Sequence, residues 1–144
     1  MITTVGIFLV DNRNRILLGH ATRAPLTLWT IPKGIQEATE QPIDTALREF
    51  REETNIDLSE YRSQLRFIGS ANYPNDKKRL YAFFLRIPDN GDKRFPNPKC
   101  ISMVDEDPPF PEVDNFRWAT YDEAVKLSHS AQKQILEANK GLFR

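Results

Sequence analysis

The chain has 144 residues, enough for one domain with a buried core, so residues 1–144 are expected to form a single domain. The 20 Lys and Arg residues balance 20 Asp and Glu residues, and a net charge of zero argues against a general nucleic-acid-binding surface. The single cysteine, Cys100, excludes an internal disulfide framework. Without a signal-peptide pattern or a long apolar run, the chain is expected to be cytoplasmic, with no membrane partner.

The first half of the chain predicts a β-hairpin followed by a helix. Thr3 to Val10 (TTVGIFLV) is apolar and partly β-branched and predicts a strand. Arg15 to Gly19 (RILLG) predicts the partner strand, across a polar turn that suits a hairpin. Leu28 to Ile31 is a short apolar piece, and Pro42 to Asn55 then has the periodicity of a helix.

The second half predicts two long strands, a loop, a short strand and two helices. In chain order they are Leu65–Tyr73, Arg79–Ile87, Pro88–Pro111, Phe116–Ala119, Thr120–Leu127 and about Ser130–Lys140. Thr120 with Glu123 makes a capping-box start for the first of these helices. Strands on both sides of the earlier helix, with helices after the last strand, indicate an α/β fold with a mixed β-sheet between helical layers.

The helix predicted at residues 42–55 carries three glutamates on one face. Glu49, Glu52 and Glu53 stand at i, i+3 and i+4, so their carboxylates converge and repel one another. An apolar stripe borders them, made of Ile43, Ala46, Leu47, Phe50 and Thr54. A bound hard cation such as Mg²⁺ would offset the repulsion, because it takes carboxylate and phosphate oxygens as ligands. The alternative reading is a surface helix with an acidic edge.

A spaced pattern that starts at a glycine extends this acidic cluster. Gly34 is followed by five residues, Glu40, seven residues and the run from Arg48 to Ile56 (REFREETNI). The pattern resembles the Nudix box, the signature of the Nudix hydrolases. Asn55 stands where the family has its second glycine. Because asparagine also tolerates the left-handed conformation that ends many helices, this departure is expected to leave the carboxylates in place.

The resemblance implies a fold, a reaction and a set of metal ligands. It implies the Nudix α/β/α sandwich, and a hydrolase that cleaves a nucleoside diphosphate linked to another group. Water attacks phosphorus in line, and divalent metal offsets the charge that develops on the oxygens. Glu49, Glu52 and Glu53, with the backbone carbonyl of Gly34, match the ligand positions for Mg²⁺, with Mn²⁺ as a substitute.

The resemblance also implies supporting and catalytic roles. Arg48 and Glu40 match residues that hold the ligand glutamates in place. The general base is expected to be Glu53 or Glu112, and Glu112 could also serve as an extra metal ligand. The alternative is that Glu112 is only a solvated loop residue, and the acidic run at residues 105–107 offers competitors for its role.

Two further segments narrow the range of expected substrates. Residues 28–34 (LWTIPKG) are similar to the lead-in of dinucleoside tetraphosphate hydrolases and of diphosphoinositol polyphosphate phosphohydrolases. Residues 112–124 (EVDNFRWATYDEA) are similar to a segment of asymmetrical diadenosine tetraphosphate hydrolases. Dinucleoside polyphosphates are therefore the expected substrates. The alternatives are RNA 5′-triphosphate ends, ADP-ribose, nucleotide sugars, inositol pyrophosphates and, more remotely, a nucleotide-binding module without catalysis.

Substrate contacts are expected from basic and aromatic residues outside the acidic helix. Lys33 and Lys78, the second within the basic triplet at residues 77–79, suit a run of phosphates, although a lysine-rich turn also serves solubility. Tyr81 could stack on a nucleobase, although core packing is the commoner fate of strand aromatics. His20 and His129 lack acidic or cysteine neighbours at ligand spacing and are expected to be structural or surface residues. The sequence leaves the oligomeric state open.

Overall fold

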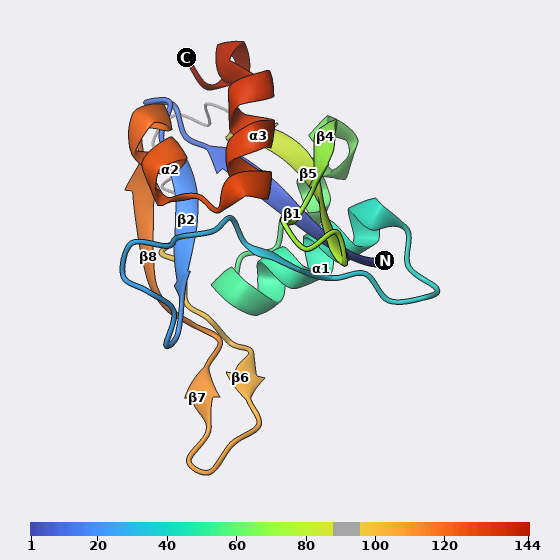
Figure 1. Cartoon of the computed structure of the whole chain (residues 1–144), viewed down its shortest axis with the longest axis vertical. Helices are drawn as coiled ribbons and strands as arrows, with labels where there is room; N and C mark the ends of the chain where they lie inside the picture. Colours follow the sequence, from blue (N-terminus) through green and yellow to red (C-terminus); the bar gives the residue numbers. More distant parts are fainter. Residues whose placement is uncertain (88–95) are drawn as a thin grey trace.

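The computed structural model describes residues 1–87 and 96–144, and its centre is a six-stranded mixed sheet (Figure 1). The strands are β1 (Ile2–Val10), β2 (Ile16–Ala21), β3 (Lys33–Ile35), β4 (Arg66–Asn72), β5 (Lys78–Arg86) and β8 (Val113–Ala119). Their order is β4-β5-β1-β2-β8, and β3 pairs with the N-terminal half of β1. Only the β1–β5 pair is parallel among these described strands.

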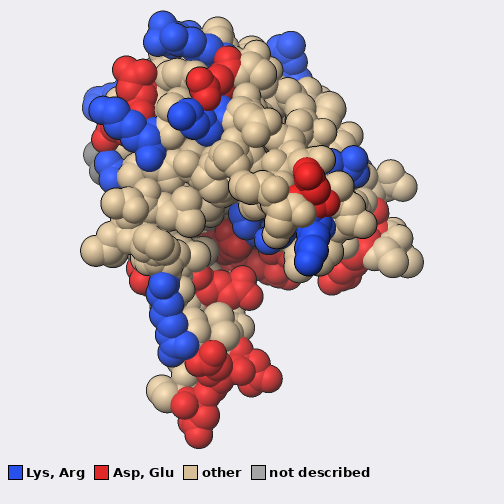
Figure 2. Space-filling view, viewed as in Figure 1, with Lys and Arg blue, Asp and Glu red and all other residues tan. Residues whose placement is uncertain are grey.

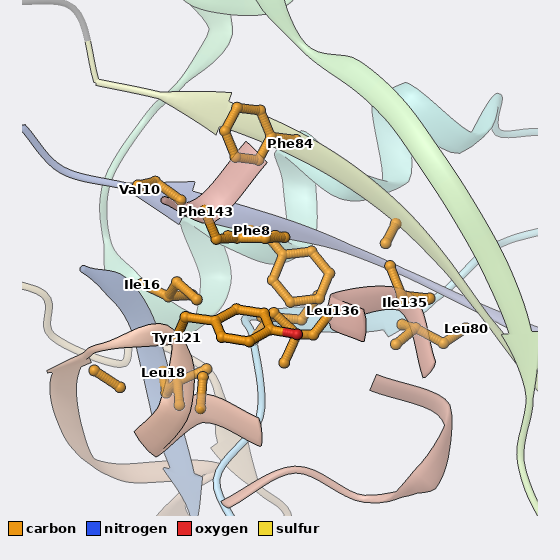
Figure 3. Packing of buried hydrophobic residues seen from close by; sticks show 14 of the residues in the cluster. Phe8, Val10, Ile16, Leu18, Leu80, Phe84, Tyr121, Ile135, Leu136 and Phe143 are labelled. Atoms are coloured by element: carbon orange, nitrogen blue, oxygen red, sulfur yellow. The ribbon is translucent and has the colours of Figure 1, made fainter. Parts of the chain in front are cut away.

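Helices cover both faces of this sheet and enclose two apolar cores. Alternate residues of β1 face opposite ways, so Val5, Ile7 and Leu9 pack toward helix α1 (Pro42–Thr54). Phe8 and Val10 pack on the other face, toward α2 (Tyr121–Leu127) and α3 (Ser130–Ala138), as Figure 3 shows for the second core. The predicted α/β/α sandwich with a mixed sheet is therefore confirmed.

Two predicted helix ends are present in the structure. Asn55 follows α1 in the left-handed conformation, with φ of 58°, and its amide donates to the Arg51 carbonyl. Thr120 and Glu123 form the complete capping box before α2. The asparagine in the glycine position thus ends α1 without disturbing the helix that carries the glutamates.

The stretch from Pro88 to Pro111 is predicted to be mainly loop, and this prediction missed two short strands. Residues 88–95 lie outside the described residues, but β6 (Met103–Val104) and β7 (Phe110–Pro111) form a second, two-stranded sheet. This sheet and its connecting turn project from the body as an arm, residues 103–111 (Figure 1). Asp105, Asp107, Pro108 and Pro109, which contributed to the prediction of loop, lie in the exposed turn of the arm.

Several element bounds also differ from the prediction. β8 begins at Val113 instead of Phe116, because Val113 pairs with Ala21 and Asn115 pairs with His20 at the end of β2. Lys33–Ile35 forms β3, and 3₁₀ turns, η1 (Ser59–Gln64) and η2 (Lys140–Phe143), follow α1 and α3. Neither stretch of the described chain contains a helix that is both long and apolar enough to span a bilayer.

Candidate active site

The buried stripe of α1 fixes the direction of its glutamates. Ala46, Phe50 and Thr54 are buried against the sheet, as the periodicity predicts, and Thr45 is buried as well. Glu49, Glu52 and Glu53 therefore lie at the border between this core and solvent, and each is partly buried. The helix presents them toward β3 and the loop that follows it, since α1 packs on β3.

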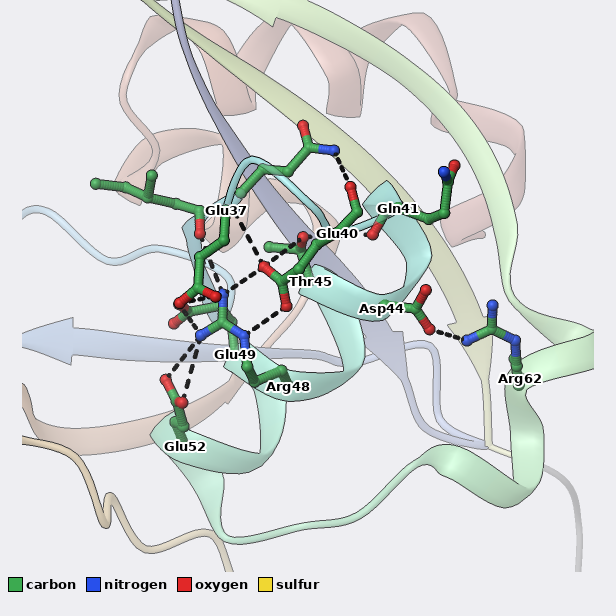
Figure 4. A network of polar contacts seen from close by, with 11 residues as sticks. Glu37, Glu40, Gln41, Asp44, Thr45, Arg48, Glu49, Glu52 and Arg62 are labelled. Carbon is green, nitrogen blue, oxygen red and sulfur yellow. Dashed lines mark hydrogen bonds and ion pairs between the residues drawn. The ribbon is translucent and has the colours of Figure 1, made fainter.

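Arg48 is the centre of a hydrogen-bonded network that holds the acidic cluster (Figure 4). Its Nε and Nη2 donate to the two carboxylate oxygens of Glu40, at 2.7 and 2.8 Å. Its Nη1 donates to Glu49 at 2.8 Å and to both oxygens of Glu52 at 3.3 Å. The hydrogen bond from Arg48 is the main cause that lowers the pKa of Glu40 to about 2. One guanidinium thus orients three carboxylates and cannot neutralise them all.

Gly34 is required by the close approach of a side chain from α1. A Cβ atom built on Gly34 would lie 1.9 Å from Cδ of Glu49, far inside van der Waals contact. The carboxylate of Glu49 consequently lies directly against the β3 backbone, and a side chain at residue 34 would displace it from this place. The structure brings Gly34 and Glu49 together, two residues that are predicted to share a metal.

Glu53 is the most strongly perturbed carboxyl group of the cluster. Its Oε1 accepts a hydrogen bond from the Lys33 amide at 3.2 Å. Burial is the main cause that raises its pKa to about 8; Lys33 opposes this shift, and the charges of Glu49 and Glu112 add to it. Burial, with Glu52 beside it, also raises the pKa of Glu49. The protein alone therefore disfavours the charged form of both carboxyl groups.

The carboxylate oxygens of this cluster are suitable ligands for a hard divalent cation, although their side chains are not arranged around a common point. In residues 1–87 and 96–144, no group of three His, Cys, Asp or Glu side chains is arranged to hold a metal. Arg48 instead ties Glu49 and Glu52, and the Lys33 amide ties Glu53. The donors are all oxygens, and a divalent cation would relieve the burial of negative charge that raises the pKa of Glu49 and Glu53.

Glu112 lies on the same side as the buried glutamates, whereas its competitors do not. Its amide donates to the Ser102 carbonyl and the Ser102 amide donates to the Glu52 carbonyl, so backbone hydrogen bonds attach Glu112 to the helix of the glutamates. Its charge contributes to the raised pKa of Glu49 and Glu53. The acidic residues 105–107 lie in the turn of the arm, where Figure 2 shows them exposed at its tip. Glu106 there pairs with Arg23 at 3.0 Å. The structure thus separates Glu112 from the other acids of its segment.

His129 lies on the α3 side of the sheet, within electrostatic reach of both Lys33 and Lys78. Burial is the main cause that lowers the pKa of His129 to about 4, and the two lysine charges lower it as well. The ring of His129 stacks on Tyr73 with 4.7 Å between centroids, and the Lys78 ammonium lies 5.1 Å from the Tyr73 ring. Within the described residues, the buried Tyr73 hydroxyl and His129 Nε2 have no hydrogen-bond partner.

The sequence analysis did not predict the contact between Tyr73 and His129. His129 caps α3, since its Nδ1 accepts from the Gln132 amide at 3.3 Å, and this function places the ring. Tyr73 ends the β4–β5 hairpin and has no motif of its own. Tyr81 lies elsewhere: it packs on the α1 side and stacks on Phe67 at 4.1 Å, on the opposite face from Lys78.

His20 is buried and doubly hydrogen-bonded, which its sequence neighbours do not indicate. Its Nδ1 lies 2.7 Å from Oδ1 of Asp114, and its Nε2 lies 3.0 Å from the Ala24 carbonyl. The hydrogen bond to Asp114 is the main cause that raises the pKa of His20 above 6.5. Asp114 is distant in sequence and reaches His20 because β8 pairs with β2.

A pH-dependent contribution to stability follows from this pair. A raised histidine pKa stabilises the fold fully below the unfolded value and is lost as pH rises through the folded value. We expect Asp114→Asn to lower the free energy of unfolding by about 1 kcal/mol near pH 6, and by less near pH 8. Urea unfolding across this range measures it, with Asp105→Asn on the arm as control. An Asp114→Asn deficit that is the same at both pH values would contradict the assignment.

Comparison with known proteins places this geometry in a family. A family model of the NUDIX domain matches residues 2–138. The RNA pyrophosphohydrolase of Rickettsia conorii is 22% identical over 147 residues, covering 93% of this chain and 84% of that protein. The RNA pyrophosphohydrolase of Psychrobacter cryohalolentis is 26% identical over 152 residues, covering 92% and 80%. The crystal structure of a C. elegans Ap4A hydrolase binary complex superposes with a TM-score of 0.67 at 20% identity, covering 99% and 97%.

Proposed function

Since the chain belongs to the Nudix family and is a hydrolase, we propose that it is a metal-dependent pyrophosphohydrolase whose substrates are dinucleoside polyphosphates. The observation that carries the proposal is the meeting of the buried acidic cluster with Lys33, whose amide binds Glu53 and whose charge reaches both Glu53 and His129. A divalent cation and a polyphosphate would lie side by side at this junction, as phosphoanhydride cleavage requires.

The acidic side of the site would hold the metal. Glu49, Glu52 and Glu53, with the Gly34 carbonyl, are the proposed ligands for Mg²⁺ or Mn²⁺. The ion would supply positive charge against the oxygens of the transition state and would lower the pKa of water. Arg48, positioned by Glu40, keeps the carboxylates of Glu49 and Glu52 oriented toward β3.

The remaining side chains handle the proton and the phosphates. The carboxylate of Glu53 already accepts a hydrogen bond from the Lys33 amide, whereas Glu112 is exposed. We therefore assign Glu112 as the group that accepts the proton of the attacking water. Lys33 and Lys78 bind the non-bridging oxygens of the polyphosphate. The Tyr73 hydroxyl and His129 Nε2 are buried polar atoms beside these lysines, and a polar group of the substrate would bind them there.

RNA 5′ ends are the second candidate substrate, because RNA pyrophosphohydrolases align with nearly the whole chain. Two features favour the dinucleotide instead. The net charge is zero, and the arm places three exposed acids, residues 105–107, on the flank of the molecule. A long RNA backbone would be repelled by such an arm, whereas a dinucleotide is short enough to avoid it.

Comparison of kcat/KM for diadenosine tetraphosphate and a 5′-triphosphorylated RNA oligonucleotide tests this preference. We expect the dinucleotide to be cleaved with the larger kcat/KM. A larger value for the RNA would establish the second candidate. Cleavage of neither, with turnover of ADP-ribose, a nucleotide sugar or an inositol pyrophosphate, would move the enzyme to another branch. Inactivity on all of them would indicate a binding module.

Lys78 and Lys77 offer a matched pair that tests the basic part of the site. Lys78 is partly buried beside Tyr73, whereas the neighbouring Lys77 side chain is exposed. We expect Lys78→Ala to raise KM about tenfold, because a charge-assisted contact to phosphate is lost, with a smaller effect on kcat. Lys77→Ala is expected to change KM by less than about twofold. Equal effects of the two substitutions on steady-state kinetics would rule out a specific role for Lys78.

A further inference from the structure

The segment that carries Glu112 is attached to the C-terminal end of α1. The amides of Ile101 and Ser102 both donate to the Glu52 carbonyl, at 3.0 and 3.1 Å, and the Lys99 amide donates to the Thr54 carbonyl at 2.8 Å. These carbonyls belong to the last turn of α1, where the helix itself leaves acceptors without partners. The start of the segment is thereby fixed to the same turn that carries the glutamates.

Glu112 itself is held by backbone contacts on both sides. Its amide donates to the Ser102 carbonyl at 3.1 Å, and its carbonyl accepts from the Thr22 amide at 3.0 Å. The hydroxyl of Thr22 donates to the carbonyl of the preceding residue, Pro111, at 2.5 Å. Thr22 therefore binds the carbonyls of Pro111 and Glu112, which lie on either side of the Glu112 Cα, and so restricts the backbone from which that side chain projects.

Irregular pairing at the end of β2 makes this contact available. The register between β2 and β8 shifts between His20 and Ala21, because Asp114 is an extra residue between the partners Asn115 and Val113. In this shifted register the Thr22 amide continues the pairing by donating to the Glu112 carbonyl, and the Thr22 hydroxyl reaches the Pro111 carbonyl. Bulges of this kind commonly redirect a side chain near a site.

We propose that Thr22 is a positioning residue for Glu112: its amide and hydroxyl hold the two carbonyls that aim the Glu112 carboxylate at Glu49 and Glu53. This rests on the function proposed above, in which Glu112 accepts the proton of the attacking water. Thr22 acts through Glu112, and its hydroxyl is already bound to the Pro111 carbonyl. Small displacements of a catalytic group reduce turnover strongly, whereas loss of one such hydrogen bond has a modest effect on folding.

Thr22→Val and Thr22→Ser separate the hydroxyl from the shape of the side chain. Valine keeps the branched shape and the backbone amide but leaves the Pro111 carbonyl without its donor, whereas serine retains the donor. With diadenosine tetraphosphate we expect Thr22→Val to lower kcat about tenfold, with KM changed by less than about twofold. Thr22→Ser is expected to stay close to wild type. Equal loss in both variants, or no loss in Thr22→Val, would overturn the proposal.

A double-mutant cycle with Glu112→Gln distinguishes positioning from a general structural effect. If Thr22 acts through Glu112, Thr22→Val causes no further fall in kcat once Glu112 is Gln. The same tenfold fall in both backgrounds would show that Thr22 acts elsewhere and would overturn the proposal. If Glu112→Gln itself keeps wild-type kcat, the assignment of Glu112 fails and the positioning role fails with it.

Hydrogen exchange at the Glu112 amide provides a readout that needs no substrate. We expect faster exchange there in Thr22→Val than in wild type or Thr22→Ser, because the segment loses one of its attachments. Unchanged exchange would overturn the positioning role of Thr22 even if activity fell. A wild-type protein that cleaves no nucleotide would refute the proposed function. The exchange result alone would then decide whether Thr22 holds the backbone at Glu112.

Discussion

Replacing Glu53 by Gln is expected to lower kcat on the order of 10²–10³-fold while the protein stays folded. The amide keeps the shape of the side chain but loses the charge that a divalent cation would bind. Burial already raises the pKa of Glu53 to about 8, so the neutral side chain costs no stability without metal. Steady-state hydrolysis with Mg²⁺, beside a thermal melt in EDTA, measures both effects.

Glu60→Gln is the control for this substitution, because Glu60 is an exposed glutamate in the 3₁₀ turn η1, outside the site. It is expected to leave kcat and the melting temperature unchanged. Activity of Glu53→Gln above about a tenth of wild type would remove Glu53 from the ligand set. A collapse of the melting temperature would instead show that the carboxylate supports the fold.

Substituting alanine for Gly34 is expected to produce the second large loss. The added Cβ would occupy the place of the Glu49 carboxyl group, which lies 1.9 Å from it, so either the side chain or β3 must move. We expect kcat/KM to fall about 10²-fold and the free energy of unfolding to fall by about 1–3 kcal/mol. Kinetics and urea unfolding of the same preparation measure the two effects.

Gly141→Ala is the matched control, because a Cβ there meets no atom within 4 Å. It is expected to change neither activity nor stability by a measurable amount. Near-normal kcat/KM in Gly34→Ala would show that the position of the Glu49 carboxylate against β3 is unimportant. That result would contradict the proposed sharing of a metal between this carboxylate and the Gly34 carbonyl.

The parts of the site predicted from the sequence are those with a local period or a fixed motif. The three glutamates share a face because of the helical repeat, and the same repeat gives the buried stripe with Ala46 and Phe50. The left-handed Asn55 follows from its place at the helix end. Each of these depends on residues within a few positions of one another.

The parts that were missed depend on contacts across the sheet. His20 has no acidic neighbour in sequence, yet β2–β8 pairing places Asp114 at 2.7 Å from its ring. The contact of Tyr73 with His129 joins a hairpin end to the cap of α3. The contacts of Thr22 with Pro111 and Glu112 use backbone carbonyls as acceptors. Every residue type has such a carbonyl, so the identities of residues 111 and 112 do not predict these contacts.

Hydrolysis of diadenosine tetraphosphate in ¹⁸O-labelled water, with Mg²⁺ and with EDTA, tests the central claim most directly. The proposed chemistry predicts ATP and AMP as products, with one ¹⁸O atom in the phosphate of one of them, because water attacks phosphorus. EDTA should abolish the reaction. Products without the label, or turnover that persists in EDTA, would contradict metal-dependent attack of water at the acidic cluster.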